Sequence, residues 1–146
     1  MAPYRAGVPI EIVFETHSTT EDNEAGIATG WLPGRLSTTG RNNARLLGER
    51  RRNDRLHAVF TSDLARAVET TTIAFGASEI PILHDWRLRE CDYGDCSAMP
   101  IAELHSHRSR HLDEPYPGGE SWRQAVTRVA RFLDDLPTRW TKGVCS

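Results

Sequence analysis

The sequence contains little cysteine, a single lysine and no long apolar run. Its three cysteines, Cys91, Cys96 and Cys145, lack the CxxC spacing of zinc sites, and the segment 1–9 shows no apolar leader. An odd number of cysteines in such a chain predicts reduced thiols and a cytoplasmic location. No apolar stretch approaches the roughly 20 residues of a membrane-spanning helix. We therefore expect no membrane partner, no metal and no other cofactor.

The net charge of −2 gives no support to a nucleic-acid-binding domain, although every basic residue except Lys142 is an arginine. No motif for reading bases accompanies the arginines, so we expect no nucleic-acid partner. A length of 146 residues suffices for one domain with a hydrophobic core. We predict a single domain over residues 1–146.

Strand-like and helix-like segments alternate along the chain. Runs rich in β-branched and aromatic residues predict strands at 10–15, 57–61 and 80–83. Capping residues and apolar periodicity predict helices at 37–52, 63–75 and 120–136, and another that starts at Pro100. Such alternation is typical of a mainly parallel sheet between two layers of helices, a three-layer α/β/α fold. Ligands bind beyond the carboxyl ends of the strands in such sheets, which directs attention to segments 16–23 and 61–66 and to the loop near 85–95.

These three segments hold the residue types of phosphoryl transfer. His17 follows the first strand, and a neutral imidazole with an ordinary pKa of about 6.5 can accept a phosphoryl group. Arg66 follows the second strand, and its guanidinium suits phosphate oxygens. Glu90 follows the third, and a carboxylic acid can protonate a departing alkoxide.

Five short motifs follow His17 in a fixed order. They are Thr29-Gly30-Trp31, Leu-Ser-Thr-Thr-Gly at 36–40, Ser-Asp-Leu-Ala-Arg-Ala-Val-Glu-Thr at 62–70, Leu-Arg-Glu-Cys-Asp-Tyr-Gly at 88–94 and Pro-Gly-Gly-Glu-Ser at 117–121. Each motif alone is weakly specific, but together they span nearly the whole chain. The sequence resembles the histidine phosphatase superfamily, which has the phosphoglycerate-mutase-like fold.

The resemblance implies a phosphomonoester hydrolase that acts through a phosphohistidine. It makes His17 the nucleophile, Glu90 the general acid and Arg66 both a catalytic and a phosphate-binding residue. It also implies phosphate contacts from Asn23 and, as weaker matches, from Thr20 and Thr29. The implied partner is a small phosphorylated substrate or inorganic phosphate, and the oligomeric state stays open, a homo-oligomer included.

The chain departs from the family pattern at two places. Thr16, which we keep among the phosphate-binding candidates, stands where the family has an arginine, and Ser18 stands where it has a glycine. The family also has a second catalytic histidine in a later strand, whereas no histidine follows His111 here. We therefore expect a domain that lacks its C-terminal strand region after Trp140.

Several alternatives stay open at this point. The chain could be an impaired enzyme that binds phosphate or a partner without turnover. Glu90 could be an ion-pair partner of Arg87 or Arg89 rather than an acid. The three histidines at 105, 107 and 111 do not share one helix face, so we expect a polar surface there rather than a metal site.

Overall fold

The computed structural model describes residues 9–140, with side chains up to residue 138. Cys145 and the segment after Trp140, on which two of the expectations fall, lie outside the described residues. The elements are α1 (Glu21–Ala25), α2 (Thr38–Arg51), β1 (Val59–Thr61), α3 (Ala65–Phe75), β2 (Ile82–His84), α4 (Ile101–His107) and α5 (Trp122–Trp140). Short 3₁₀ turns lie at η1 (Trp86–Leu88), η2 (Gly94–Cys96) and η3 (Arg110–Leu112).

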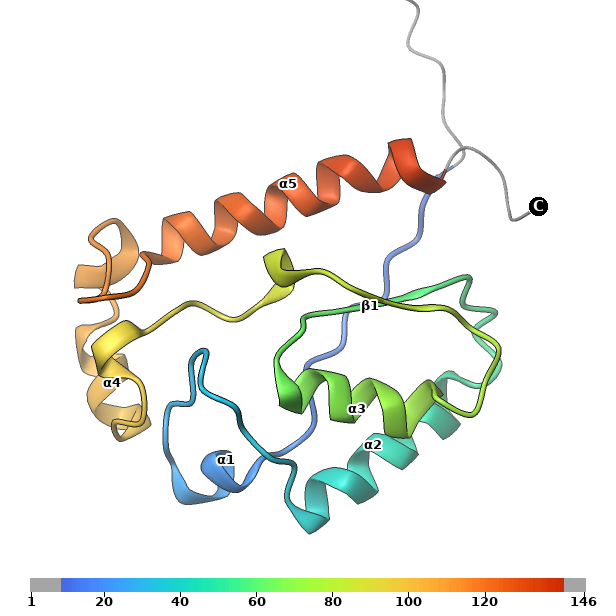
Figure 1. Ribbon diagram of the computed structural model, residues 1–146, viewed down its shortest axis with the longest axis horizontal. Helices are drawn as coiled ribbons and strands as arrows, with labels where there is room; N and C mark the ends of the chain where they lie inside the picture. The colour runs from blue at the N-terminus through green and yellow to red at the C-terminus, as the bar shows by residue number, and fades with distance from the viewer. Residues whose placement is uncertain (1–8, 141–146) are drawn as a thin grey trace, which may run out of the picture.

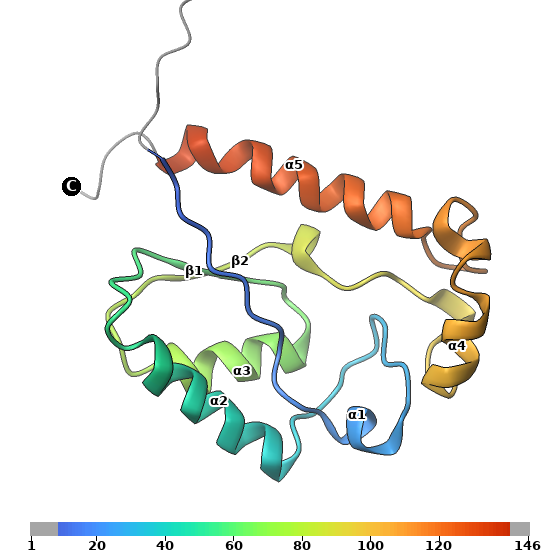
Figure 2. The same ribbon diagram turned by 180° about the vertical axis from the view of Figure 1, so that it is seen from behind.

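A parallel pair of strands forms the middle layer of the fold. β1 pairs with β2 in a register that sets Val59 opposite Ile82 and Thr61 opposite His84. Helix α5 lies on one side of the pair, and α3 with α2 lies on the other (Figures 1 and 2). This arrangement confirms the predicted α/β class with a parallel sheet covered by helices.

The helices form where capping and burial favour them. Ser37 caps α2, because its hydroxyl accepts a hydrogen bond from the Gly40 amide at 3.0 Å. Helix α5 buries Phe132 and Leu136, and the Phe132 ring meets Phe60 of β1 edge to face with 5.2 Å between ring centroids. Both helices were predicted, within a few residues of their ends.

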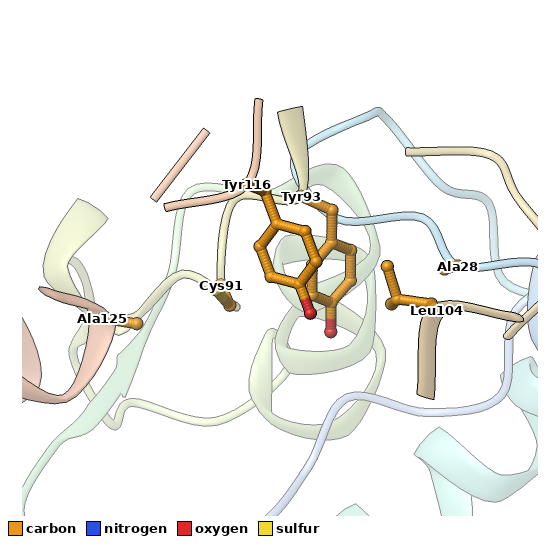
Figure 3. Packing of buried hydrophobic residues seen from close by; sticks show 6 residues of the cluster. All are labelled: Ala28, Cys91, Tyr93, Leu104, Tyr116 and Ala125. Atoms are coloured by element: carbon orange, nitrogen blue, oxygen red, sulfur yellow. The ribbon is translucent and has the colours of Figure 1, made fainter. Parts of the chain in front are cut away.

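A cluster of buried side chains joins several loops to α4 and α5 (Figure 3). Its members are Ala28, Cys91, Tyr93, Leu104, Tyr116 and Ala125. Tyr93 and Tyr116 pack edge to face with 5.3 Å between ring centroids. Because Cys91 and Tyr93 follow Glu90 closely in sequence, this cluster fixes the loop that carries the predicted acid.

The predicted strand at 10–15 is wrong for the described residues. Figure 2 shows the segment crossing in front of the strand pair, but within residues 9–140 its backbone makes no hydrogen bond, and Phe14 is 83% exposed. β-rich composition favours an extended chain, yet a strand exists only where a neighbour satisfies its backbone groups.

None of the helices in the described part of the chain combines the length and the hydropathy of a membrane-spanning segment.

Candidate active site

His17 lies half-buried in the loop that follows the extended N-terminal segment. Its Nδ1 lies 2.7 Å from the carbonyl oxygen of Ser18. A carbonyl only accepts, so this contact places the proton on Nδ1 and leaves the lone pair on Nε2. Burial lowers the pKa of His17 below 6.5, and the positive charge of Arg66 lowers it further. The imidazole is therefore a neutral base or nucleophile at pH 7.

The loop around His17 is fastened to α2 and α3. The Ser18 amide donates to Thr70 Oγ1 at 3.0 Å, and the Ser18 hydroxyl donates to the Gly40 carbonyl at 2.6 Å. Thr70 Oγ1 in turn donates to the Arg66 carbonyl at 2.7 Å. Ser18 thus joins the histidine loop to α3 through its backbone amide, as a glycine could, and to α2 through its hydroxyl, a contact that a glycine would not make.

Arg66 is almost completely buried in the first turn of α3. Its Nη2 donates to the Gly30 carbonyl at 2.8 Å, and its Nη1 donates to the Leu32 carbonyl at 3.3 Å. Gly30 adopts a φ of +56°, and a Cβ there would lie 3.0 Å from the Tyr93 ring, so glycine favours the backbone conformation that directs this carbonyl to Arg66. The two backbone acceptors fix the plane of the guanidinium before any ligand binds.

Glu90 faces Arg66 and completes the constellation. Its Oε2 lies 2.9 Å from Arg66 Nη2, and its Oε1 accepts a hydrogen bond from the Tyr93 hydroxyl at 2.6 Å. The hydrogen bonds from the Ser18 amide to Thr70 and from Thr70 to the Arg66 carbonyl, together with the Arg66–Glu90 pair, bring the His17 loop, Arg66 and Glu90 into one neighbourhood. The alternative partners were wrong: Arg87 pairs with Asp85 and Asp135, and Arg89 pairs with Asp63.

Two aromatic residues hold Glu90, and sequence reasoning had given neither a role of this kind. Burial and the charge of Glu90 raise the pKa of Tyr93, so its phenol stays protonated and donates to that carboxylate. Trp31 Nε1 donates to the Glu90 carbonyl at 2.7 Å. Both residues belong to the quoted motifs, which was the only signal available for them.

The remaining phosphate-binding candidates make local contacts in the structure. Thr20 caps α1: its hydroxyl accepts from the Asn23 amide, and Asn23 Oδ1 accepts from the Thr20 amide, each at 3.0 Å. Thr29 donates to Asp22 at 2.8 Å. Thr16 is exposed and lines a groove with His17 and Arg50. Their roles toward phosphate stay predictions.

Three histidines away from this neighbourhood lie in α4 and η3. His105 and His107 are exposed as expected, whereas the polar-surface prediction was wrong for His111, which is 7% exposed. Its ring stacks on Tyr116 with 3.9 Å between ring centroids, and its Nδ1 lies 3.0 Å from the Glu114 carbonyl oxygen. Among the residues with described placement, no group of histidine, cysteine and acidic side chains could hold a metal ion.

The amino-acid sequence is similar to those of known phosphatases and mutases. A sequence model of the histidine phosphatase superfamily (branch 1) matches residues 12–145. A 2,3-bisphosphoglycerate-dependent phosphoglycerate mutase from Methylobacterium radiotolerans is 35% identical over 132 residues, covering 81% of this chain and 62% of that protein. Phosphoserine phosphatase 1 from Hydrogenobacter thermophilus is 27% identical over 144 residues, covering 92% of this chain and 68% of that protein.

A solved structure gives the same result for the fold. The mycobacterial glucosyl-3-phosphoglycerate phosphatase in complex with VO3 superposes with a TM-score of 0.71 at 26% identity, over 82% of this chain and 63% of that one. The chain spans less than two thirds of the length of the mutase and of this solved phosphatase.

Proposed function

The chain belongs to the histidine phosphatase superfamily, and on that premise we propose that it hydrolyses small phosphomonoesters through a phosphohistidine at His17. The observation that carries the proposal is the arrangement of a buried Arg66, Glu90 at 2.9 Å from that arginine, and a His17 whose Nδ1 lies 2.7 Å from the Ser18 carbonyl oxygen. Phosphoryl transfer depends mostly on positioning and on electrostatic stabilisation, which a preset guanidinium supplies. The mutase and the two phosphatases named above act on different phosphorylated compounds, so the substrate is proposed only as a class.

The chemistry proceeds in two steps. Nε2 of His17 attacks phosphorus while the bond from phosphorus to the ester oxygen breaks, and Glu90, which takes a proton from solvent once the substrate displaces its pair with Arg66, gives that proton to the departing oxygen. Arg66 stabilises the charge on the transferred group. Water then attacks the phosphorus, Glu90 takes a proton from that water, and the bond from phosphorus to nitrogen breaks to release phosphate and neutral His17.

One observation favours a second candidate, a chain that binds phosphate with little turnover. Thr16 stands where an arginine precedes the histidine in the family pattern, so one cationic donor is lacking beside His17. Loss of one preorganised donor typically lowers the rate by about 10²–10³-fold.

Steady-state hydrolysis of 4-nitrophenyl phosphate tests both candidates. The first predicts turnover that disappears in His17→Gln, with the fold retained by circular dichroism. The second predicts saturable phosphate binding by calorimetry without turnover in either chain. Turnover that persists in His17→Gln would contradict both.

A further inference from the structure

Arg128 of α5 binds the backbone of the loop that carries Glu90. Its Nη1 donates to the carbonyls of Arg87 and Arg89 at 2.8 and 2.6 Å, and its Nη2 donates to the Glu90 carbonyl at 2.7 Å. The Arg128 side chain is 6% exposed. A single buried guanidinium thus satisfies three backbone acceptors within four consecutive residues.

Glu120, from the Pro-Gly-Gly-Glu-Ser motif, completes this arrangement from the other side. Its carboxylate accepts from Arg128 Nε at 3.1 and 3.2 Å and from the Asp92 amide at 3.1 Å. The Glu120 amide donates to the Asp92 carbonyl at 3.0 Å. The Arg128–Glu120 pair therefore holds the backbone both before and after Glu90, and we call it the loop clamp.

The two motifs approach each other at backbone distance. Gly94 adopts a φ of +50°, and a Cβ there would lie 2.2 Å from the Pro117 carbonyl oxygen and 2.5 Å from the Gly119 amide nitrogen. The Asp95 amide donates to the Pro117 carbonyl at 2.8 Å. This contact places Glu120 beside the Leu-Arg-Glu loop and explains why glycine occupies both motifs at the crossing.

A buried ion pair gives little net stability, because desolvation offsets the attraction between its charges. The effect of Arg128 is therefore on position: its donors that do not bind Glu120 all bind one short loop, and they fix where that loop lies. The Glu90 carbonyl accepts from both Trp31 and Arg128, and the Arg128 guanidinium lies 5.8 Å from the centroid of the Trp31 ring. The Glu90 backbone is thus restrained from two elements at once.

We infer that Arg128 and Glu120 are positioning residues that hold Glu90 where it protonates the leaving oxygen. The inference rests on the proposed function, and it assigns a role to the Pro-Gly-Gly-Glu-Ser motif that the resemblance alone did not give. Misplacement of a reacting group by about 1 Å can lower a rate by roughly 10²-fold. Displacement of Glu90 should therefore lower the rate only for substrates whose leaving oxygen must be protonated.

The test compares two substrates in two arginine variants of the full chain. Arg128→Lys keeps the positive charge and removes the planar guanidinium that donates to several carbonyls at once. Arg87→Met is the matched control, because the Arg87 side chain also joins this loop to α5, through Asp135, and does not touch the Glu90 backbone. The substrates are 4-nitrophenyl phosphate, whose phenolate leaves with little protonation, and an alkyl phosphate, whose alkoxide needs a full proton.

Arg128→Lys should lower kcat/KM for the alkyl phosphate by about 10²-fold and for 4-nitrophenyl phosphate by less than about threefold. Arg87→Met should change both substrates by the same small factor. An equal loss on the two substrates in Arg128→Lys, or no loss, would overturn the inference. Because a fold defect would lower both rates together, the split separates positioning from stability.

A second readout needs no turnover and separates failure of the clamp from failure of the proposed function. The Trp31 indole N–H donates to the Glu90 carbonyl, so its NMR signal, assigned with Trp31→Phe, reports where the loop lies. That signal should shift or broaden in Arg128→Lys and stay unchanged in Arg87→Met. An unchanged signal in Arg128→Lys would overturn the inference, whereas absence of turnover in the unmodified chain would refute only the proposed function.

Discussion

Replacing Arg66 with methionine tests the anion site and the fold at once. Arg66→Met keeps the length of the side chain and removes three donor contacts, to the Gly30 carbonyl, the Leu32 carbonyl and Glu90. Each of these hydrogen bonds contributes about 1 kcal/mol net to the free energy of unfolding. The ion pair with Glu90 is given no larger contribution, because the Glu90 side chain is 39% exposed and solvent screens the pair. We expect the free energy of unfolding to fall by about 3 kcal/mol.

The same substitution should weaken anion binding by a separate amount. A charge-assisted hydrogen bond to phosphate contributes about 1.5–3 kcal/mol, which corresponds to a roughly 10- to 150-fold rise in Kd. Urea titration followed by tryptophan fluorescence measures the first effect. Calorimetry with vanadate or phosphate, at urea-free conditions where the variant is folded, measures the second.

Glu90→Gln provides the matched comparison, because it removes the negative charge that competes for the same guanidinium. Vanadate should bind this variant more tightly than the unmodified chain, whereas it should bind Arg66→Met more weakly. The reasoning is refuted if Arg66→Met binds vanadate as tightly as the unmodified chain, or if Glu90→Gln weakens binding.

Four further outcomes follow from the structure. Burial and Arg66 lower the pKa of His17, so the acid limb of kcat/KM against pH should have its midpoint below 6.5; an NMR titration of the His17 ring that gives a higher value contradicts this. Between the folded-state pKa of His17 and about pH 6.5, the unfolded chain binds a proton on this histidine that the folded chain does not. The contribution of His17 to the free energy of unfolding is therefore fully present above about pH 6.5 and is lost as pH falls toward the folded-state pKa. In urea titrations, His17→Gln should reduce this dependence of stability on pH. Thr16→Arg should tighten phosphate binding by about tenfold through one added charged donor, and weaker binding in calorimetry would argue against its place beside the anion site. Burial raises the pKa of the Cys91 thiol to about 12, so peptide mapping after maleimide treatment at pH 7 should find Cys91 unlabelled until the chain unfolds; rapid native labelling contradicts this.

The sequence alone was sufficient for elements whose signal is local. Ser37 marks the start of α2 by its own hydroxyl, and the spacing of Phe132 and Leu136 marks the buried face of α5. Residues 10–15 show the limit of such reasoning, because their composition is typical of a strand while their backbone has no partner within the described part of the chain.

The candidate site residues were named from the sequence, but their contacts were not. The spacing of motifs indicates that His17, Arg66 and Glu90 belong together, but it does not say that Glu90 pairs with Arg66 rather than with a neighbouring arginine. That choice depends on how Tyr93 and Trp31 fix the loop, and both contacts join residues brought together only by the tertiary fold. His111 was misjudged for the same reason, because its stacking partner Tyr116 lies beyond the helix considered.

The most direct test of the account is chemical identification of the phosphorylated residue. The chain is mixed with a phosphomonoester, quenched in base to preserve phosphohistidine, and its peptides are sequenced by mass spectrometry. The account predicts one phosphoryl group on the peptide that contains His17, and none in His17→Gln. Phosphate on another residue, or turnover with no phosphoenzyme in the unmodified chain and an undiminished rate in His17→Gln, would contradict it.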